Sequence, residues 1–354
     1  MENNRVREAR LYDKIKGKIT CCTCERYCEI AKGERGFCGT RENIDGKLYT
    51  LVYGDISSVA IHPIEHKPLF HFYPGSRVLT VSTWSCNFEC GWCFRKYLSK
   101  AHDQVGNGTF ISPDDVLSLM RKHDCQGIAI SFNEPTLLLE WTLDVFPLAK
   151  KLGYYTAYVT NGYMSFNALK LLAEHGLDAM NIDVKGDGET VRRECGGDEE
   201  KIWRNAVESK KLGMWIEITT LIIPGINDSL RCLEGIASQI KGFLGNDIPW
   251  HVNAYFPRDT YALKRFGLST PESTLLRARD IGEKVGLHYI YAGGYPGLNQ
   301  NTYCPLCKEL LIERQGFGFE LFHNRMGEKK RCHQCGRPIP IIGKSAEYTR
   351  TYFQ

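Results

Sequence analysis

Apolar and polar residues alternate with a regular rhythm from residue 77 onward. Short runs rich in β-branched and aromatic residues are separated by stretches with the apolar spacing of helices. We expect six strands, each followed by a helix, at residues 77–84, 127–132, 154–160, 178–184, 215–223 and 249–255. Because parallel neighbours need crossover connections, this repeat predicts an α/β fold with a parallel sheet. Six units are too few for a complete eight-fold barrel, so we expect an open, partial (β/α)6 TIM-like barrel.

The rhythm stops on either side of this barrel. Residues 1–76 combine a cysteine-rich start, a short strand within 47–59 and an irregular connector, punctuated by prolines, at 63–75. After residue 297 the βα pattern ends, and two C-x2-C pairs follow. The chain is therefore predicted to have three parts, which are a Cys-rich segment at 1–76, a barrel at 77–297 and a zinc-ribbon-like module at 298–354.

Composition narrows the class of protein. A chain of 354 residues with 43% hydrophobic content can bury one large core, and its net charge of +4 is too mild to indicate nucleic-acid binding by itself. No run approaches the roughly 18 to 20 apolar residues of a membrane helix, and the first residues lack the apolar segment of a signal peptide. We therefore expect a cytoplasmic protein with no membrane partner.

The cysteines change this picture most. There are 15 of them, an odd number, and most stand in tight C-x2-C or C-x3-C pairs, which indicates metal ligation rather than disulfides. The expected setting is a reducing, anaerobic cytoplasm. Three clusters predict three separate metal sites.

The first cluster lies between residues 21 and 38. Cys24, Cys28 and Cys38, with either Cys21 or Cys22, can supply four thiolates. We take Cys21 as the fourth ligand and keep Cys22 as the alternative. The spacing does not choose between zinc and an auxiliary iron–sulfur cluster, and a metal-free loop is a further alternative.

The second cluster, Cys86, Cys90 and Cys93, follows directly after the first predicted strand. Three thiols spaced C-x3-C-x2-C can converge on one soft metal centre, but they cannot close a four-ligand zinc shell on their own. In an iron–sulfur cluster held by three cysteines, the fourth iron remains open to a small molecule.

The third cluster is a C-x2-C…C-x2-C set that predicts a zinc ribbon. Its ligands are Cys304, Cys307, Cys332 and Cys335. Basic residues surround it and form either a solvated face or a docking surface for RNA or an acidic protein. They are Arg325, Lys329, Lys330, Arg331 and Arg337.

Polar side chains stand at or just after the ends of the predicted strands, so a barrel would gather them on one rim. They are Cys86, Glu134, Thr160, Asp183, Lys185 and His251. Each has an ordinary structural explanation when taken alone, such as a helix start at Glu134, a surface pair of Asp183 with Lys185, or a buried core histidine at His251. Their common placement favours a functional rim.

The C-x3-C-x2-C spacing is the signature of radical S-adenosylmethionine (SAM) enzymes, and the chain resembles their activating-enzyme branch. In particular it resembles the radical SAM member of the AmmeMemoRadiSam group, which is similar to pyruvate formate-lyase activating enzyme. The resemblance extends over nearly the whole chain. It rests on Gly36-Phe37-Cys38-Gly39, residues 63–76, Asn133-Glu134-Pro135-Thr136, Pro224-Gly225-Ile226-Asn227-Asp228, Pro249-Trp250-His251 and residues 301–307.

The resemblance implies a 4Fe-4S cluster on Cys86, Cys90 and Cys93 whose open iron chelates the amino and carboxylate groups of SAM. It also implies a set of SAM-binding residues. These are Trp92 and His251 near the adenine, Asn133 and Glu134 at the methionine ammonium, and Lys185, in Asp183-Val184-Lys185, at the carboxylate.

The activity implied is that of an oxidoreductase. A low-potential donor reduces the cluster, SAM is cleaved, and a 5′-deoxyadenosyl radical abstracts hydrogen from a protein or peptide, as in a glycyl-radical activase. The chain differs from the pattern of this family at two places. Phe94-Arg95-Lys96 replaces the Gln-Asn or His-Asn that commonly follows the third cysteine, and Val159 replaces an aspartate that helps to bind a monovalent cation.

Two other functions stay open at this point. One is a radical SAM enzyme that modifies RNA or a small molecule, with the basic ribbon as the grip on RNA. The other is a non-catalytic iron–sulfur or zinc scaffold. The sequence does not decide between protein, peptide and RNA as the substrate.

Overall fold

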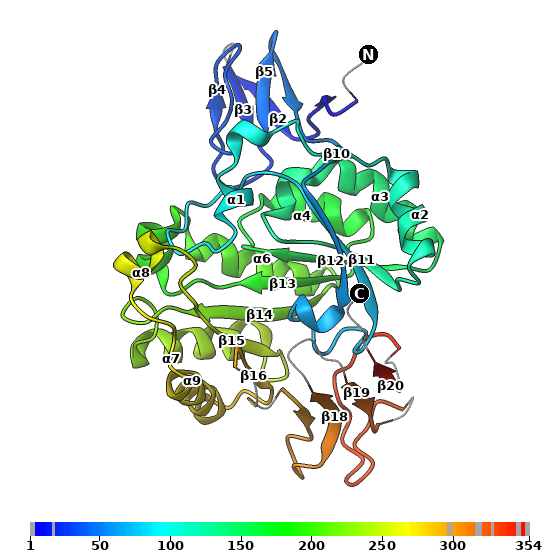
Figure 1. Ribbon diagram of the computed structural model, residues 1–354, viewed down its shortest axis with the longest axis vertical. Coiled ribbons are helices and arrows are strands. Elements are labelled where there is room, and N and C mark those ends of the chain that lie inside the picture. Colours follow the sequence, from blue (N-terminus) through cyan, green and yellow to red (C-terminus); the bar gives the residue numbers. More distant parts are fainter. Residues whose placement is uncertain are drawn as a thin grey trace. The chain divides into compact units, whose positions relative to one another are not determined.

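The computed structural model describes residues 4–15, 18–295, 298, 300–315, 321–326, 329–344 and 348–350 (Figure 1). The chain divides into two compact units. The first contains residues 1–61, 78–180 and 194–214, and the second contains residues 62–77, 181–193 and 215–354. These units cut across the three predicted parts of the chain, and the boundary expected at residue 297 lies outside the described residues.

The first unit begins with small antiparallel sheets. One has the order β1-β6-β5 (Arg7–Glu8, Lys47–Thr50, Arg41–Ile44), and another has the order β2-β3-β4 (Tyr12–Ile15, Lys18–Cys21, Glu29–Ile30). A third pairs β7 (Asp55–Ile56) with β10 (Thr109–Phe110). Their small apolar core includes Ile19, Ile30 and Leu48. Only the strand at 47–50 was predicted, because strands of two to four residues are too short to show an apolar period.

Parallel strands follow in the same unit. β11 (Gly127–Ile130) pairs in parallel with β9 (Arg77–Ser82) on one side and with β12 (Tyr155–Thr160) on the other. Helices α2 (Pro113–Lys122), α3 (Leu139–Lys151), α4 (Phe166–Glu174) and α6 (Glu199–Lys211) accompany them, with a short α1 at Lys96–Ser99. Ser112 caps α2 in a capping box with Asp115, and proline follows at the first turn. The predicted start of this helix is therefore confirmed.

The second unit carries another parallel set. β15 (Trp250–Ala254) pairs with β14 (Trp215–Ile222) and with β16 (Ile290–Gly293), and the end of β13 (Ala179–Asp183) leads to Val184, whose N–H donates to Thr219 O at 2.9 Å. The helices are α5 (Gly188–Thr190), α7 (Leu230–Gln239), α8 (Thr260–Phe266) and α9 (Glu272–Val285). Gly286 ends α9 with φ +102°, as a left-handed cap requires.

The C-terminal sheet of this unit is antiparallel, with the order β17-β18-β19-β20 (Thr302–Tyr303, Leu310–Gln315, Leu321–Asn324, Tyr348–Arg350). The predicted irregular connector packs in the same unit. Phe70 belongs to an apolar core with Tyr291, Leu311 and Phe322. The buried Arg314 joins the two parts, because its Nη2 donates to Phe70 O at 2.8 Å and its Nε lies 3.4 Å from a carboxylate oxygen of Glu65.

The structure confirms the predicted fold class, a mixed α/β protein with parallel strands. All six expected strands are present within three residues of their predicted ends. β16 is a further parallel strand that was not predicted. Within the described parts of the chain, no helix is both long enough and apolar enough to span a bilayer.

Candidate active site

The cysteine loop, residues 85–93, starts where β9 ends. Ser85 and Phe132, which precede Cys86 and Asn133, both have φ +71°, a left-handed conformation that is unfavourable for such side chains and must be held by the surrounding structure. Cys93 Sγ lies 3.3 Å from the Ser99 hydroxyl at the end of α1. The thiols thus lie on a loop with a defined, strained entry.

Asn133 holds the entry of this loop. Its Oδ1 accepts from the N–H of Thr83 at 3.3 Å, and its Nδ2 donates to Ser85 O at 2.8 Å and Trp84 O at 3.3 Å. The first role of Asn133 is therefore to fix the backbone that leads to Cys86. Its contact with a cofactor stays a prediction.

Glu134 is buried, and both of its oxygens accept hydrogen bonds. Oε1 accepts from Thr136 N–H (3.1 Å), the Thr136 hydroxyl (2.5 Å) and the Thr160 hydroxyl (2.8 Å), whereas Oε2 accepts from Asn161 N–H (2.9 Å). Burial raises the pKa of Glu134, and these hydrogen bonds oppose the rise. The predicted proximity of Glu134 and Thr160 is therefore present in the structure.

Asn161, just after β12, links this carboxylate to the cysteine loop. Its Nδ2 donates to Asn87 Oδ1 at 2.7 Å and lies 3.9 Å from Cys86 Sγ. Burial, with the nearby Glu134 carboxylate as a second cause, raises the pKa of Cys86. Cys86 is therefore a thiol in the bare protein, and a bound cation is needed to hold it as a thiolate.

In the second unit, Asp183 and Lys185 form an ion pair at the end of β13, with 2.7 Å between Nζ and Oδ2. The carbonyl of Lys185 accepts from Asn227 Nδ2 at 2.8 Å. Asn227 also donates to Leu221 O and accepts from Ile223 N–H. The Pro224–Asp228 motif therefore fastens the loop after β14 to the loop that carries Lys185.

His251 lies inside the second unit with a partner that the sequence reasoning missed. Its Nε2 is 2.7 Å from Glu217 Oε2, and its ring stacks on Tyr291 with the centroids 5.3 Å apart. Glu217 also accepts from the N–H groups of Phe70 (2.9 Å), His71 (2.8 Å) and the Trp215 indole (2.9 Å). Burial alone would raise the pKa of Glu217, but these bonds, led by His251, hold it below its ordinary value.

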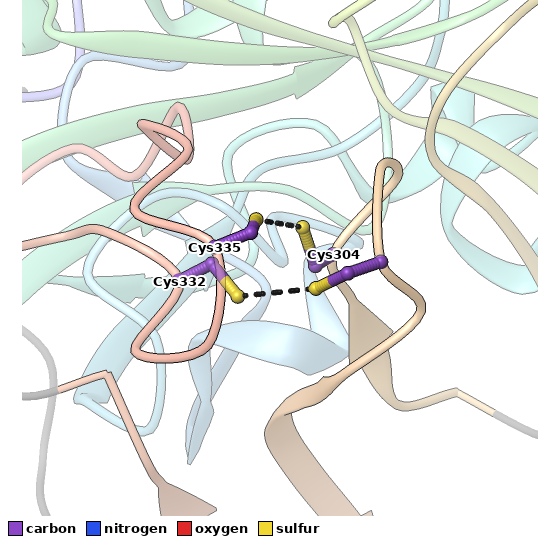
Figure 2. A group of neighbouring side chains, drawn as sticks. Cys304, Cys332 and Cys335 are labelled. Carbon is purple, nitrogen blue, oxygen red and sulfur yellow. Dashed lines mark hydrogen bonds between the residues drawn. The ribbon is translucent and has the colours of Figure 1, made fainter.

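The four C-terminal cysteines converge as predicted. Their sulfur atoms all lie within 4.8 Å of one another, and the pairs Cys304–Cys335 and Cys307–Cys332 are each 3.5 Å apart (Figure 2). A tetrahedral zinc ion with bonds of about 2.3 Å places its sulfur ligands about 3.8 Å apart, so this donor set fits one zinc ion. Although burial acts in the opposite direction, the N–H groups of Cys307 and Leu306 lower the pKa of Cys304 to about 7. That zinc is the metal stays a prediction.

Comparison with known proteins decides the family. A model of the radical SAM superfamily matches residues 81–232, which include the cysteine loop, Asn133, Glu134 and Lys185. An uncharacterized protein of Methanocaldococcus jannaschii is 38% identical over 339 residues, which cover 95% of this chain and 100% of that protein. The chain belongs to the radical SAM superfamily.

A second relative supports this family, and a solved domain resembles part of the chain. A second Methanocaldococcus jannaschii protein, provisionally named a glycyl-radical enzyme activating enzyme, is 28% identical over 224 residues, covering 58% of this chain and 77% of that protein. A solved domain of pyruvate-formate lyase-activating enzyme from Bacteroides vulgatus has a TM-score of 0.41 and 17% identity, covering 48% of this chain and 99% of that one. The chain is therefore an enzyme, and its family implies a 4Fe-4S cluster and SAM.

The residues of the loop fit such a cluster. Among the described residues, the C-terminal cysteines are the only group with three or more ligand atoms all within 4.8 Å of one another. Cys86, Cys90 and Cys93 are thus spread wider than one ion needs, as expected for three thiolates that bind three different irons. Within the first unit the structure gathers Cys86, Glu134 and Thr160, and within the second it pairs Asp183 with Lys185 and His251 with Glu217.

Sequence reasoning missed the side chains that position this site. Asn87 and Asn161 hold the cysteine loop, Glu217 orients His251, and Asn227 fixes the backbone of Lys185. Asn161 and Asn227 stood in motifs that were noticed, but their partners are 42 to 74 residues away in the chain. Glu217 could have been found from the sequence, because it is an acidic residue within the apolar strand predicted at 215–223.

Proposed function

We propose that this radical SAM enzyme cleaves SAM reductively and abstracts hydrogen from a protein or peptide, in the manner of a glycyl-radical activating enzyme. The observation that carries the proposal is the cysteine loop, which Asn133 and Asn161 hold next to the buried carboxylate of Glu134. Relatives named glycyl-radical enzyme activating enzymes support the class of substrate.

In this proposal Cys86, Cys90 and Cys93 hold the cluster, which supplies the electron that breaks the carbon–sulfur bond of SAM. Glu134 receives the methionine ammonium. A carboxylate offers about four acceptor positions, and among the described residues Oε2 accepts a single hydrogen bond, so this oxygen keeps room for a charged donor. The buried Trp92 is the residue of the cysteine loop that we expect near the adenine.

The resemblance also predicts roles for two residues of the second unit, Lys185 and His251. Lys185 stays the residue predicted for the SAM carboxylate, and within the second unit its ammonium forms an ion pair with Asp183. His251 offers its ring to the adenine, with Glu217 fixing its orientation through Nε2. Asp183 keeps Lys185 in place.

Modification of RNA is supported less well. Two basic residues of the ribbon have acidic partners within the chain. Arg325 Nη2 lies 2.6 Å from Glu313, and Arg337 Nη2 lies 3.8 Å from Asp247. Each of these pairs lowers the positive charge available to a phosphate backbone.

The test uses anaerobically reconstituted enzyme with a low-potential reductant and SAM. We expect 5′-deoxyadenosine, a cluster EPR signal that shifts when SAM is added, and loss of both in the triple variant Cys86→Ala, Cys90→Ala, Cys93→Ala. To identify the substrate class, the enzyme is given separate fractions of a deuterated lysate of the source organism, which are protein treated with ribonuclease, RNA treated with protease, and small molecules. Deuterium in 5′-deoxyadenosine from the protein fraction supports the proposal, and deuterium only from RNA or from small molecules refutes it. The cytoplasm stays the predicted location.

A further inference from the structure

The N-terminal cysteines of the first unit surround a pocket of their own. The empty volume of this pocket, which includes space open to solvent, is about 360 Å³. Four cysteines line it, and they come from the end of β3, the turn that follows and the loop before β5. They are Cys21, Cys24, Cys28 and Cys38. This is the set expected from the sequence.

The structure also separates Cys21 from Cys22. Cys22 does not line the pocket, and its thiol points instead to Asp13 Oδ2 (3.5 Å) and Thr20 O (3.4 Å). Cys21 is the last residue of β3 and lies on the buried side of that strand with Ile19.

Tight backbone geometry brings these thiols together. Cys21 N–H donates to Cys28 O at 2.9 Å, and Gly36 N–H donates to Arg41 O at 3.0 Å. A Cβ on Gly36 would lie 3.0 Å from a methyl carbon of Ile30 and 3.6 Å from Cys28 Sγ, so only glycine fits there without displacing its neighbours. The loop that carries Cys38 therefore packs close to Cys28.

The spacing of the sulfurs distinguishes this pocket from the zinc-like C-terminal group. Among the described residues, no three N-terminal cysteines have all their sulfurs within 4.8 Å of one another, whereas the C-terminal four do. The N-terminal set shares this wider spacing with Cys86, Cys90 and Cys93, the loop that belongs to the superfamily's cluster. Thiolates on one ion must crowd together, but thiolates on separate irons of a cubane stand farther apart.

Buried donors line the pocket as well. Arg41 and Asn87 are each 1% exposed, and neither Arg41 Nε nor Asn87 Nδ2 has a hydrogen-bond partner among the described residues. Buried N–H groups normally find acceptors. The sulfur atoms of a metal centre, which are thiolates and, in an iron–sulfur cluster, inorganic sulfides as well, are such acceptors.

We propose that Cys21, Cys24, Cys28 and Cys38 bind a second 4Fe-4S cluster. With four thiolates this cluster has no open iron, so it binds no SAM. It shares one residue with the SAM-cleaving loop, because Asn87 lines its pocket and directly follows Cys86. Arg26 also lines the pocket, and its Nε donates to Asn87 O at 2.5 Å. The proposal does not depend on the substrate of the enzyme.

Metal content of the full chain, reconstituted anaerobically, tests this. We expect about eight irons and eight sulfides per wild-type chain, and about four of each in the triple variant Cys86→Ala, Cys90→Ala, Cys93→Ala. The double variant Cys24→Ser, Cys28→Ser should also keep about four irons, with an EPR signal that still shifts on addition of SAM. Cys22→Ser is the matched control and should keep about eight.

Three results would overturn the proposal. They are about four irons in the wild-type chain, an iron-free triple variant, or zinc at both N- and C-terminal sites with iron only on the Cys86 loop. If the double variant does not fold, the wild-type and triple-variant counts still decide. Failure to form 5′-deoxyadenosine would bear on the proposed function and would leave these counts unaffected.

Discussion

Two buried carboxylates, Glu134 in the first unit and Glu217 in the second, have the same number of hydrogen bonds but different partners. Among the described residues, Glu134 accepts only from neutral groups, namely backbone N–H and threonine hydroxyls, and burial raises its pKa. Glu217 accepts from His251 as well, and its pKa is lowered. This difference supports Glu134 as the carboxylate that binds a cationic group of the ligand. A buried negative charge without a positive partner is costly until a ligand supplies one.

Glu217→Gln should give the largest effect. The amide replaces one acceptor oxygen by an NH2 group, which faces the N–H donors of Phe70, His71 or Trp215 and leaves them unpaired. We expect the free energy of unfolding to fall by about 3 kcal/mol, measured by denaturant titration. A loss below about 0.5 kcal/mol would show that the hydrogen bonds of Glu217 do not stabilise the folded second unit.

Glu134→Gln is the matched variant in the first unit and should act on ligand binding. Loss of a charge-assisted hydrogen bond of about 1.5 to 3 kcal/mol weakens SAM binding by roughly tenfold to a hundredfold. Titration of the SAM-dependent EPR shift measures this affinity. Equal affinity in wild type and Glu134→Gln would remove Glu134 from the SAM site.

The two carboxylates should also respond to pH with opposite signs. The folded pKa of Glu217 lies below the ordinary value of about 4.5, so its contribution to stability is present above about pH 4.5 and is lost as the pH falls through the folded pKa. The folded pKa of Glu134 lies above 4.5, so its contribution is present at low pH and is lost as the pH rises through that pKa. When the stability curve of each Gln variant is subtracted from that of wild type, the Glu217 contribution should rise with pH below about pH 4.5, and the Glu134 contribution should fall with pH above about pH 4.5. Contributions that change in the same direction would contradict the comparison.

Asn161→Ala should have a smaller effect on stability and should slow insertion of the cluster in the first unit. The change removes the bond to Asn87 Oδ1 and leaves the backbone N–H that binds Glu134. We expect a stability loss of about 1 kcal/mol and slower cluster insertion, followed by absorbance during reconstitution. Asn227→Ala is the control in the second unit, and insertion at the same rate in both variants would show that Asn161 does not position the loop.

Much of this arrangement could be predicted from local patterns. The apolar runs located all six strands, Ser112 and Pro113 marked the start of α2, and cysteine spacing grouped the four C-terminal thiols correctly. The alternation of side chains in β3 would even have favoured Cys21 over Cys22, had the strand been recognised. β3 was missed because four residues carry too little periodicity.

The contacts that define the roles of the site residues were beyond such reasoning. Asn87 meets Asn161 across 74 residues, and Glu217 meets Phe70 across 147. These pairings depend on strand order and on loop conformation, as at Ser85 and Phe132, where no glycine marks the positive φ. Only the folded chain shows that Glu217 has an imidazole partner and that Glu134 has backbone N–H and threonine hydroxyl partners.

The asparagines around the cysteine loop have a consequence for how the enzyme matures. Because Asn133 fastens the start of the loop and Asn161 fastens Asn87, the conformational entropy of ordering Cys86 is lost when the polypeptide folds, before any iron arrives. The apoprotein therefore presents a preorganised receptor, and iron and sulfide can enter it without a coupled folding step.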